Sequence, residues 1–267
     1  MKKIIASVLA LFICLSFVSC GRMGVIELDS FLSDGGKSIL EEANGAEMYR
    51  MTYTTVMFAQ GSATVETVTV YDKTSGITYS EMTFNGNPYM SFFVKGSTVY
   101  YETINGKEQK IKGKLESIAG IQDFIDVSAR LDAALLPLTL SATKLSSLRA
   151  RAVYKSDSDG IYHYVFTLGD KYLAYAAKNT DGAFDQVFGE SDPESLPVSV
   201  NDYEITYSLG GEGTLLLITD YNSFKIEEGE SVYNYETCVT IEKYSGDKLA
   251  FDENEYSEPP TGEYIKK

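Results

Sequence analysis

Short runs of alternating residues joined by turn-forming pairs dominate the middle of this chain and most constrain its fold. From Met48 onward, runs such as "SATVETVTVY", "ITYSEMTF" and "STVYYET" are separated by Asn85-Gly86, Lys95-Gly96 and Asn105-Gly106. An Asn-Gly pair between β-rich runs is typical of a tight hairpin turn. The pattern predicts an antiparallel meander of about six strands.

Helical periodicity flanks this meander on both sides. The segment "DSFLSDGGKSILEEANG" predicts an N-terminal helix that Gly35-Gly36 weakens, and Leu115 to Leu136 predicts a longer helix with one apolar stripe, ended by Pro137. A short helical piece around "SATKLSSL" follows. The later runs "RARAVYK", "GIYHYVFTL", "KYLAYAAK", "DYEITYSL", "GTLLLITDYNSFKI" and "YNYETCVTIEKY" predict a second antiparallel set. The chain is therefore expected to be α+β, with helices covering a mostly antiparallel sheet.

The first twenty residues have the layout of a secretory signal. Lys2 and Lys3 precede an uncharged apolar stretch, Ile4 to Val18, which is shorter than the ~20 residues that a spanning helix needs. The sequence Phe17-Val18-Ser19-Cys20 resembles a bacterial lipobox, although Phe17 departs from the usual Leu. It predicts cleavage after residue 19 and a diacylglycerol on Cys20, so membrane contact comes through acyl chains. A soluble secreted protein cut elsewhere, or an uncleaved anchor, is the alternative.

Charge and cysteine content narrow the partners. Removal of residues 1–19 leaves 248 residues with 21 basic and 38 acidic side chains, a net charge of −17. Such a field disfavours nucleic acid and anionic headgroups, so no nucleic-acid partner and no basic membrane-binding patch are expected. Besides Cys20, only Cys238 remains, and it is expected to be an unpaired thiol without a disulfide.

Few residues suggest catalysis. His163 is the only histidine, and it lies in a strand without an acid at dyad spacing, which disfavours a Ser-His-Asp system. Acidic residues are plentiful, but no pair is singled out, so a carboxylate-based hydrolase remains a weak third hypothesis. We expect no enzyme activity, no cofactor and no metal site.

The aromatic strand residues are the candidates for a hydrophobic cavity, with core packing as the alternative for each. The candidate lining residues are Tyr53, Phe58, Phe92, Tyr100, Tyr164, Phe166, Tyr203 and Tyr207.

The order of helix, meander, central helix and second strand set resembles the LolA-like lipoprotein carriers and the acylated LppX/LprG-type lipoproteins. The likeness runs through "GSTVYYET", the helix from Leu115 to Leu136, "SDGIYHYVFTL" and "DYEITYSLGGEGTLLLI". It implies a half-barrel of about 10–11 strands, its concave face covered by one long and one or two short helices, with a cavity for acyl chains. No ligand-binding residue of the family can be carried over.

These observations give an expected organisation and function. The regions are a signal peptide at 1–19, a lipidated tether at 20–28, one domain at 29–251 and a flexible polar tail at 252–267. We expect a monomeric, extracytoplasmic lipoprotein, anchored through Cys20, that binds or carries a lipid or another hydrophobic ligand. The alternative is an envelope scaffold or interaction module with no ligand cavity.

Overall fold

A computed structural model describes residues 23–58, 62–115, 125–156, 160–179, 198–228 and 231–258. The strands are β1 Met23–Val25, β2 Met48–Phe58, β3 Ser62–Asp72, β4 Ile77–Phe84, β5 Asn87–Lys95, β6 Thr98–Ile104, β7 Lys107–Lys114, β8 Arg151–Ser156, β9 Tyr162–Thr167, β10 Val198–Leu209, β11 Leu215–Glu228 and β12 Ser231–Lys243. The helices are α2 Leu28–Phe31, α3 Lys37–Gly45, α5 Val127–Thr139, α6 Ala142–Ser147 and α7 Asp170–Asn179, with a π-helical turn at Leu32–Gly36 and a 3-10 turn at Glu253–Glu255.

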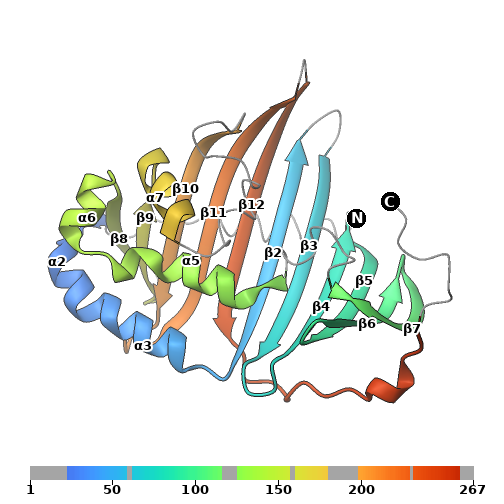
Figure 1. Cartoon of the computed structure of the whole chain (residues 1–267). Helices are drawn as coiled ribbons and strands as arrows, with labels where there is room; N and C mark the ends of the chain where they lie inside the picture. The colour runs from blue at the N-terminus through green and yellow to red at the C-terminus, as the bar shows by residue number, and fades with distance from the viewer. Residues whose placement is uncertain are drawn as a thin grey trace.

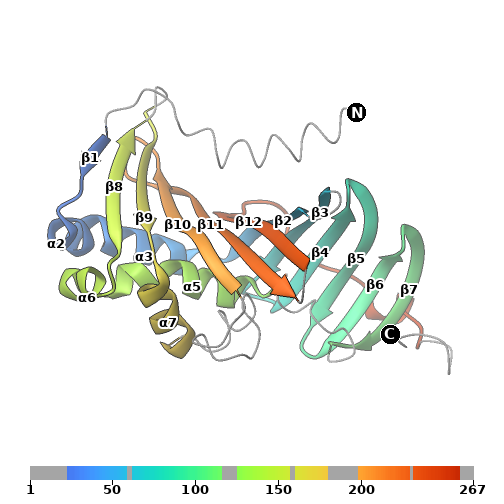
Figure 2. The same cartoon turned by 90° about the horizontal axis from the view of Figure 1, so that it is seen from above.

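All of these strands belong to one open antiparallel sheet. Its order is β1-β8-β9-β10-β11-β12-β2-β3-β4-β5-β6-β7, so β1 and β7 are the two edges. The helices from α2 to α7 lie on one face, mainly over the part of the sheet that runs from β8 to β2 (Figures 1 and 2). The predicted α+β class with a curved antiparallel sheet and few helices is confirmed.

The hairpin turns form where the Asn-Gly pairs predict them. Asn85 and Gly86 have φ angles of 49° and 75°, and Asn105 and Gly106 have φ angles of 51° and 72°. Positive φ at both central residues defines the turn whose twist matches that of the flanking strands. These turns fix the register of β4 with β5 and of β6 with β7.

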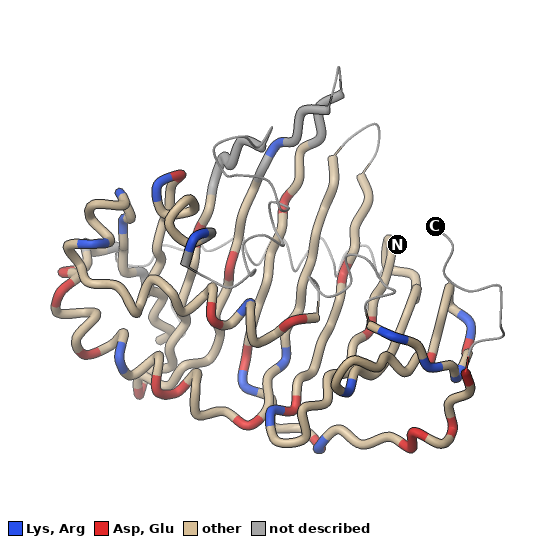
Figure 3. Tube along the Cα trace, in the orientation of Figure 1, with Lys and Arg blue, Asp and Glu red and all other residues tan. Residues whose placement is uncertain are grey.

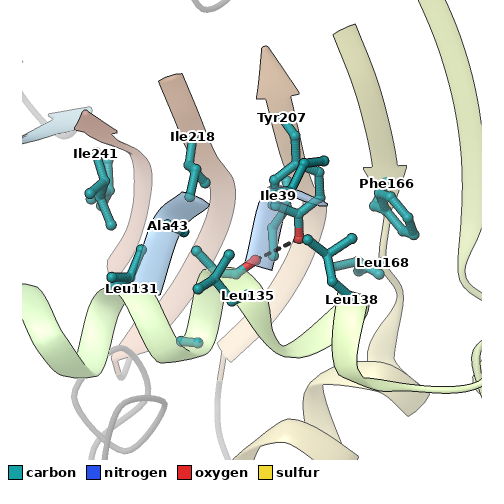
Figure 4. Close-up of a cluster of buried hydrophobic side chains, with 14 of the residues drawn as sticks. Ile39, Ala43, Leu131, Leu135, Leu138, Phe166, Leu168, Tyr207, Ile218 and Ile241 are labelled. Atoms are coloured by element: carbon teal, nitrogen blue, oxygen red, sulfur yellow. Dashed lines mark hydrogen bonds between the residues drawn. The ribbon is translucent and has the colours of Figure 1, made fainter. Parts of the chain in front are cut away.

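The helix layer packs its apolar side chains against the β9–β2 part of the sheet. Leu131, Leu135 and Leu138 of α5 are buried and face Ile39 and Ala43 of α3 and the strands (Figure 4). The N-terminal helical segment is continuous from Leu28 to Gly45, and its Gly35-Gly36 pair falls in the π-helical turn.

Only the C-terminal part of the predicted central helix lies within the described residues, and its end differs from the prediction. Of the predicted span from Leu115 to Leu136, residues 116–124 lie outside the described part. α5 begins at Val127, where the Asp126 side chain accepts a hydrogen bond from the Ala129 amide at 2.9 Å. Pro137 does not end the helix, which continues to Thr139.

The strand predicted for "KYLAYAAK" is wrong, because this segment forms helix α7. Tyr172, Leu173 and Ala176 are buried on one side of it, a helical spacing that the short apolar run concealed.

The polar tail predicted from Asp252 is also corrected, because it is attached to the sheet as far as Glu258. Phe251 stacks on Phe93 with ring centroids 4.5 Å apart, and Tyr256 is 5 % exposed. Ser257 forms a parallel bridge with Ile111 of the edge strand β7. Acidic tail residues also pair with lysines, including Glu253 with Lys95 at 2.7 Å and Glu258 with Lys112 at 3.2 Å. Acidic and basic positions lie close together at this end of the sheet (Figure 3). Ring stacking and opposite charge therefore hold a segment whose composition suggests disorder.

Candidate hydrophobic ligand site

The predicted aromatic residues divide between the two faces of the sheet. Those on the helix-covered face are Tyr53, Phe92, Tyr164, Phe166, Tyr203 and Tyr207. Strand register explains the grouping, since Tyr207 lies opposite Tyr164 and Tyr101 lies opposite Phe92.

Three of these aromatic rings are packed as core. Phe166 and Tyr207 are fully buried and Tyr203 is 3 % exposed, with the Phe166 and Tyr207 rings edge to face at 5.7 Å. The Tyr207 hydroxyl donates a hydrogen bond of 2.6 Å to the Ala134 carbonyl of α5 (Figure 4). These side chains join the helices to the sheet as part of the hydrophobic core.

Phe58 and Tyr100 lie on the face of the sheet opposite the helix layer. Tyr100 pairs with Phe93, while its neighbour Tyr101 pairs with Phe92 on the helix side. The tail covers Tyr100, whose hydroxyl donates to a Glu253 carboxylate oxygen at 2.9 Å. Phe58 is 40 % exposed. A two-residue alternation assigns side chains to alternate faces without saying which face the helices cover.

A cavity of about 210 Å³ lies where the helix layer begins, between β3–β5 and the N-terminal end of α5. Its lining residues are Tyr71, Thr78, Val94, Leu115, Ile125, Asp126, Val127 and Ser128. Val94, Ile125 and Val127 are buried and give it an apolar wall, whereas Asp126 and Ser128 are exposed at its rim. Phe92, Val99 and Tyr101 pack with Ile125 beside it as a second, smaller core.

None of the eight predicted residues lines this cavity. Tyr71, Thr78 and Val94 point to the helix side of their strands, which the alternation allowed, but the start of α5 that completes the wall was not predictable from periodicity. The cavity is smaller than the roughly 300–1,000 Å³ of sites for drug-sized ligands. It suits one narrow apolar chain with its polar end at the rim.

A buried polar group lies deeper in the same layer, under α5 and α7. Burial raises the pKa of the Asp220 carboxyl to about 6, while the nearby Arg130 guanidinium and a 3.4 Å hydrogen bond from the Tyr203 hydroxyl oppose that rise. Arg130 also lies over the Tyr53 ring, 5.2 Å from its centroid. Burial also raises the pKa of Tyr172 and Tyr203. The group therefore contains the titratable carboxyl of Asp220, and the phenols of Tyr172 and Tyr203 are neutral at neutral pH.

The side chain of His163 is buried and contacts the adjacent strand. Its Nδ1 lies 2.9 Å from the Ser208 Oγ on the adjacent strand, and its side chain is 3 % exposed. Within the described ranges, no group of three or more His, Cys, Asp or Glu side chains is arranged to hold a metal ion. In the same part of the chain, no helix combines the length and apolar character needed to cross a bilayer.

The predicted lipidation site, Cys20, lies outside the described residues. Cys238 of β12 is buried and disulfide-bonded, which corrects the expected unpaired thiol; its partner also lies outside the described part.

Comparison with protein-family models finds no match, and comparison with curated proteins finds none either. Solved structures with a similar arrangement include the lipoprotein LppX of Mycobacterium tuberculosis, 10% identical with a TM-score of 0.34 over 79% of this chain and 94% of that one. A LolA superfamily protein of Nitrosomonas europaea is 10% identical with a TM-score of 0.31 over 83% and 96% of the two chains. An S-type phycobiliprotein lyase of Guillardia theta is 10% identical with a TM-score of 0.26 over 81% and 99%. The first two proteins bear the names of the groups that the sequence pattern resembles. Their TM-scores below 0.5 do not establish a shared function.

Proposed function

We propose that this chain is an extracytoplasmic lipoprotein, anchored through Cys20, that binds the end of an acyl chain or a similar narrow hydrophobic ligand. The observation that carries the proposal is the cavity of about 210 Å³ at the start of α5, with its apolar wall of Val94, Ile125 and Val127. An apolar wall with few polar groups at the rim favours a ligand that contributes hydrophobic area and one polar end.

The cavity size sets the class of ligand. About 210 Å³ accommodates part of one chain, so a second chain of a diacyl lipid would remain outside. We therefore expect single-chain fatty acids or lysolipids to bind more tightly than double-chain lipids of the same length.

The test compares two substitutions on the same helix. Ser128→Trp places a bulky side chain at the cavity rim, whereas Thr139→Trp changes an exposed position at the far end of α5. Binding of a fluorescent fatty acid to the unacylated domain should weaken only in the Ser128 variant. Equal binding by both variants would show that the ligand binds outside this cavity.

A scaffold without a ligand remains the second candidate, and the filled core around Phe166 and Tyr207 favours it. Mass spectrometry of organic extracts from the purified, unacylated domain separates the two. Co-purifying lipid supports the carrier; its absence, together with no fatty-acid binding, supports the scaffold.

The anchor is tested independently of the ligand. Metabolic labelling with an acyl probe should mark the native chain and leave the Cys20→Ser variant unlabelled, because the linkage requires the thiol. Label retained by the serine variant would contradict lipidation at Cys20.

We also infer that the protein is not an enzyme. The burial of His163 beside Ser208 supports this inference, because a buried imidazole is not open to a substrate. A screen of glycan substrates tests for a carboxylate-based hydrolase. Turnover of any of these substrates would overturn the inference that the protein is not an enzyme.

A further inference from the structure

The N-terminal edge of the sheet begins immediately after the proposed anchor. Cys20 precedes Met23 by three residues, and Met23–Val25 is already paired with β8 in a fixed register. Three residues span at most ~11 Å even when fully extended. The predicted tether at 20–28 is thus largely replaced by folded chain, and a lipid on Cys20 holds the β1–β8 edge at the bilayer surface.

A group of tyrosines occupies this same edge. Tyr154 lies opposite Gly24 of β1, and its ring is 5.7 Å from that of Tyr162 and 5.5 Å from that of Tyr164. All three tyrosines are half-buried, so part of each ring faces solvent. Tyrosine is enriched where membrane meets water, because its ring is apolar and its hydroxyl is polar.

Apolar side chains just after β1 extend this surface. Ile26 and Leu28 are only partly buried, and Phe31 supports the tyrosines from below by stacking on Tyr164 at 4.3 Å. The stacking orients the rings before any membrane is present, so ordering them costs little on contact.

The other edge is occupied by the C-terminal tail. β7 carries Lys107, Lys110, Lys112 and Lys114, and two of these pair with acidic residues of the tail. Ser257 of the tail also forms a bridge with Ile111 of β7. One edge of the sheet is therefore bridged by the tail, whereas the other begins three residues after Cys20.

We propose that the β1–β8 edge, through Tyr154, Tyr162 and Tyr164, rests in the headgroup region of the bilayer that carries the Cys20 lipid. This inference rests on the proposed anchor and adds the orientation of the domain. The partner is the phospholipid surface itself.

The absence of tryptophan from the sequence allows a direct test with single-tryptophan reporters. Tyr162→Trp reports on the anchored edge, and Tyr89→Trp, at a position 42 % exposed on β5, is the distant control. The lipidated full-length protein is reconstituted into phosphatidylcholine vesicles with and without brominated acyl chains. Bromine should quench the Tyr162 variant and leave the Tyr89 variant unchanged.

The controls separate the two ways in which the inference can fail. Tyr154→Trp serves as a second reporter if the Tyr162 variant does not fold, as judged by circular dichroism. Mass spectrometry of the same sample establishes whether Cys20 carries lipid. A lipidated protein with no quenching, or with equal quenching at both positions, overturns the orientation alone; an unlipidated chain overturns the anchor as well.

Discussion

The buried carboxyl of Asp220 should make this protein less stable as the pH rises from about 4 to about 6. Burial is the first cause of its raised pKa, which increases from 3.8 to about 6 in the folded chain. Between these values the unfolded chain releases a proton that the folded chain keeps, so the free energy of unfolding falls with increasing pH. Below about pH 4 both states are protonated, and above about pH 6 the full penalty applies.

The expected size follows from the same two pKa values. At 1.36 kcal/mol per pH unit, the penalty reaches up to about 3 kcal/mol at neutral pH. Asp220→Asn removes the titrating group while keeping its shape and its place beside Tyr203. Urea unfolding at several pH values should therefore give a flatter dependence between pH 4 and 6 in this variant.

Asp247→Asn is the matched control, because it removes one negative charge from an exposed position. If the Asp220 and Asp247 variants show the same pH dependence, Asp220 does not keep its proton in the folded state. The reasoning from burial would then be refuted.

Three further changes test how the layers are held together. Tyr207→Phe removes the buried hydrogen bond to Ala134 and should lower the free energy of unfolding by about 1 kcal/mol in urea denaturation; no loss would contradict that bond. Leu135→Ala, at a side chain 4 % exposed, should cost about 2–5 kcal/mol, and the half-buried Leu136→Ala should cost clearly less, so equal losses would count against the packing of α5. Phe251→Ala should free the tail by removing its ring stacking and speed limited proteolysis near the C-terminus; an unchanged cleavage rate would show that other contacts hold the tail.

Local signals in the sequence were sufficient for the class of fold. Asn85-Gly86 and Asn105-Gly106 specify their turns because positive φ is needed at both positions, and that requirement is independent of the rest of the chain. The antiparallel order of β2 to β7 follows from such turns. The prediction of a strand at residues 171–178 is wrong because a short run rich in tyrosine and alanine fits both strand and helix patterns until its burial is known.

The candidate site was harder to predict because it depends on contacts distant in sequence. Tyr100 alternates as regularly as Tyr101, but only the packing of Ile125 and Phe251 on opposite faces decides which ring meets the helix layer. The cavity lies where the N-terminal end of α5 meets β3–β5. No local pattern in the sequence specifies how a helix end meets strands that are distant along the chain.

The order of the strands also places the cavity far along the sheet from the predicted anchor. Seven strand spacings of ~4.8 Å, about 34 Å measured along the curved sheet, lie between β1 and β3 at the cavity wall. A ligand bound there would be far from the membrane leaflet in which the protein is anchored. Ligand exchange with a second carrier protein or with an opposing membrane would then be favoured over direct extraction of the ligand from that leaflet.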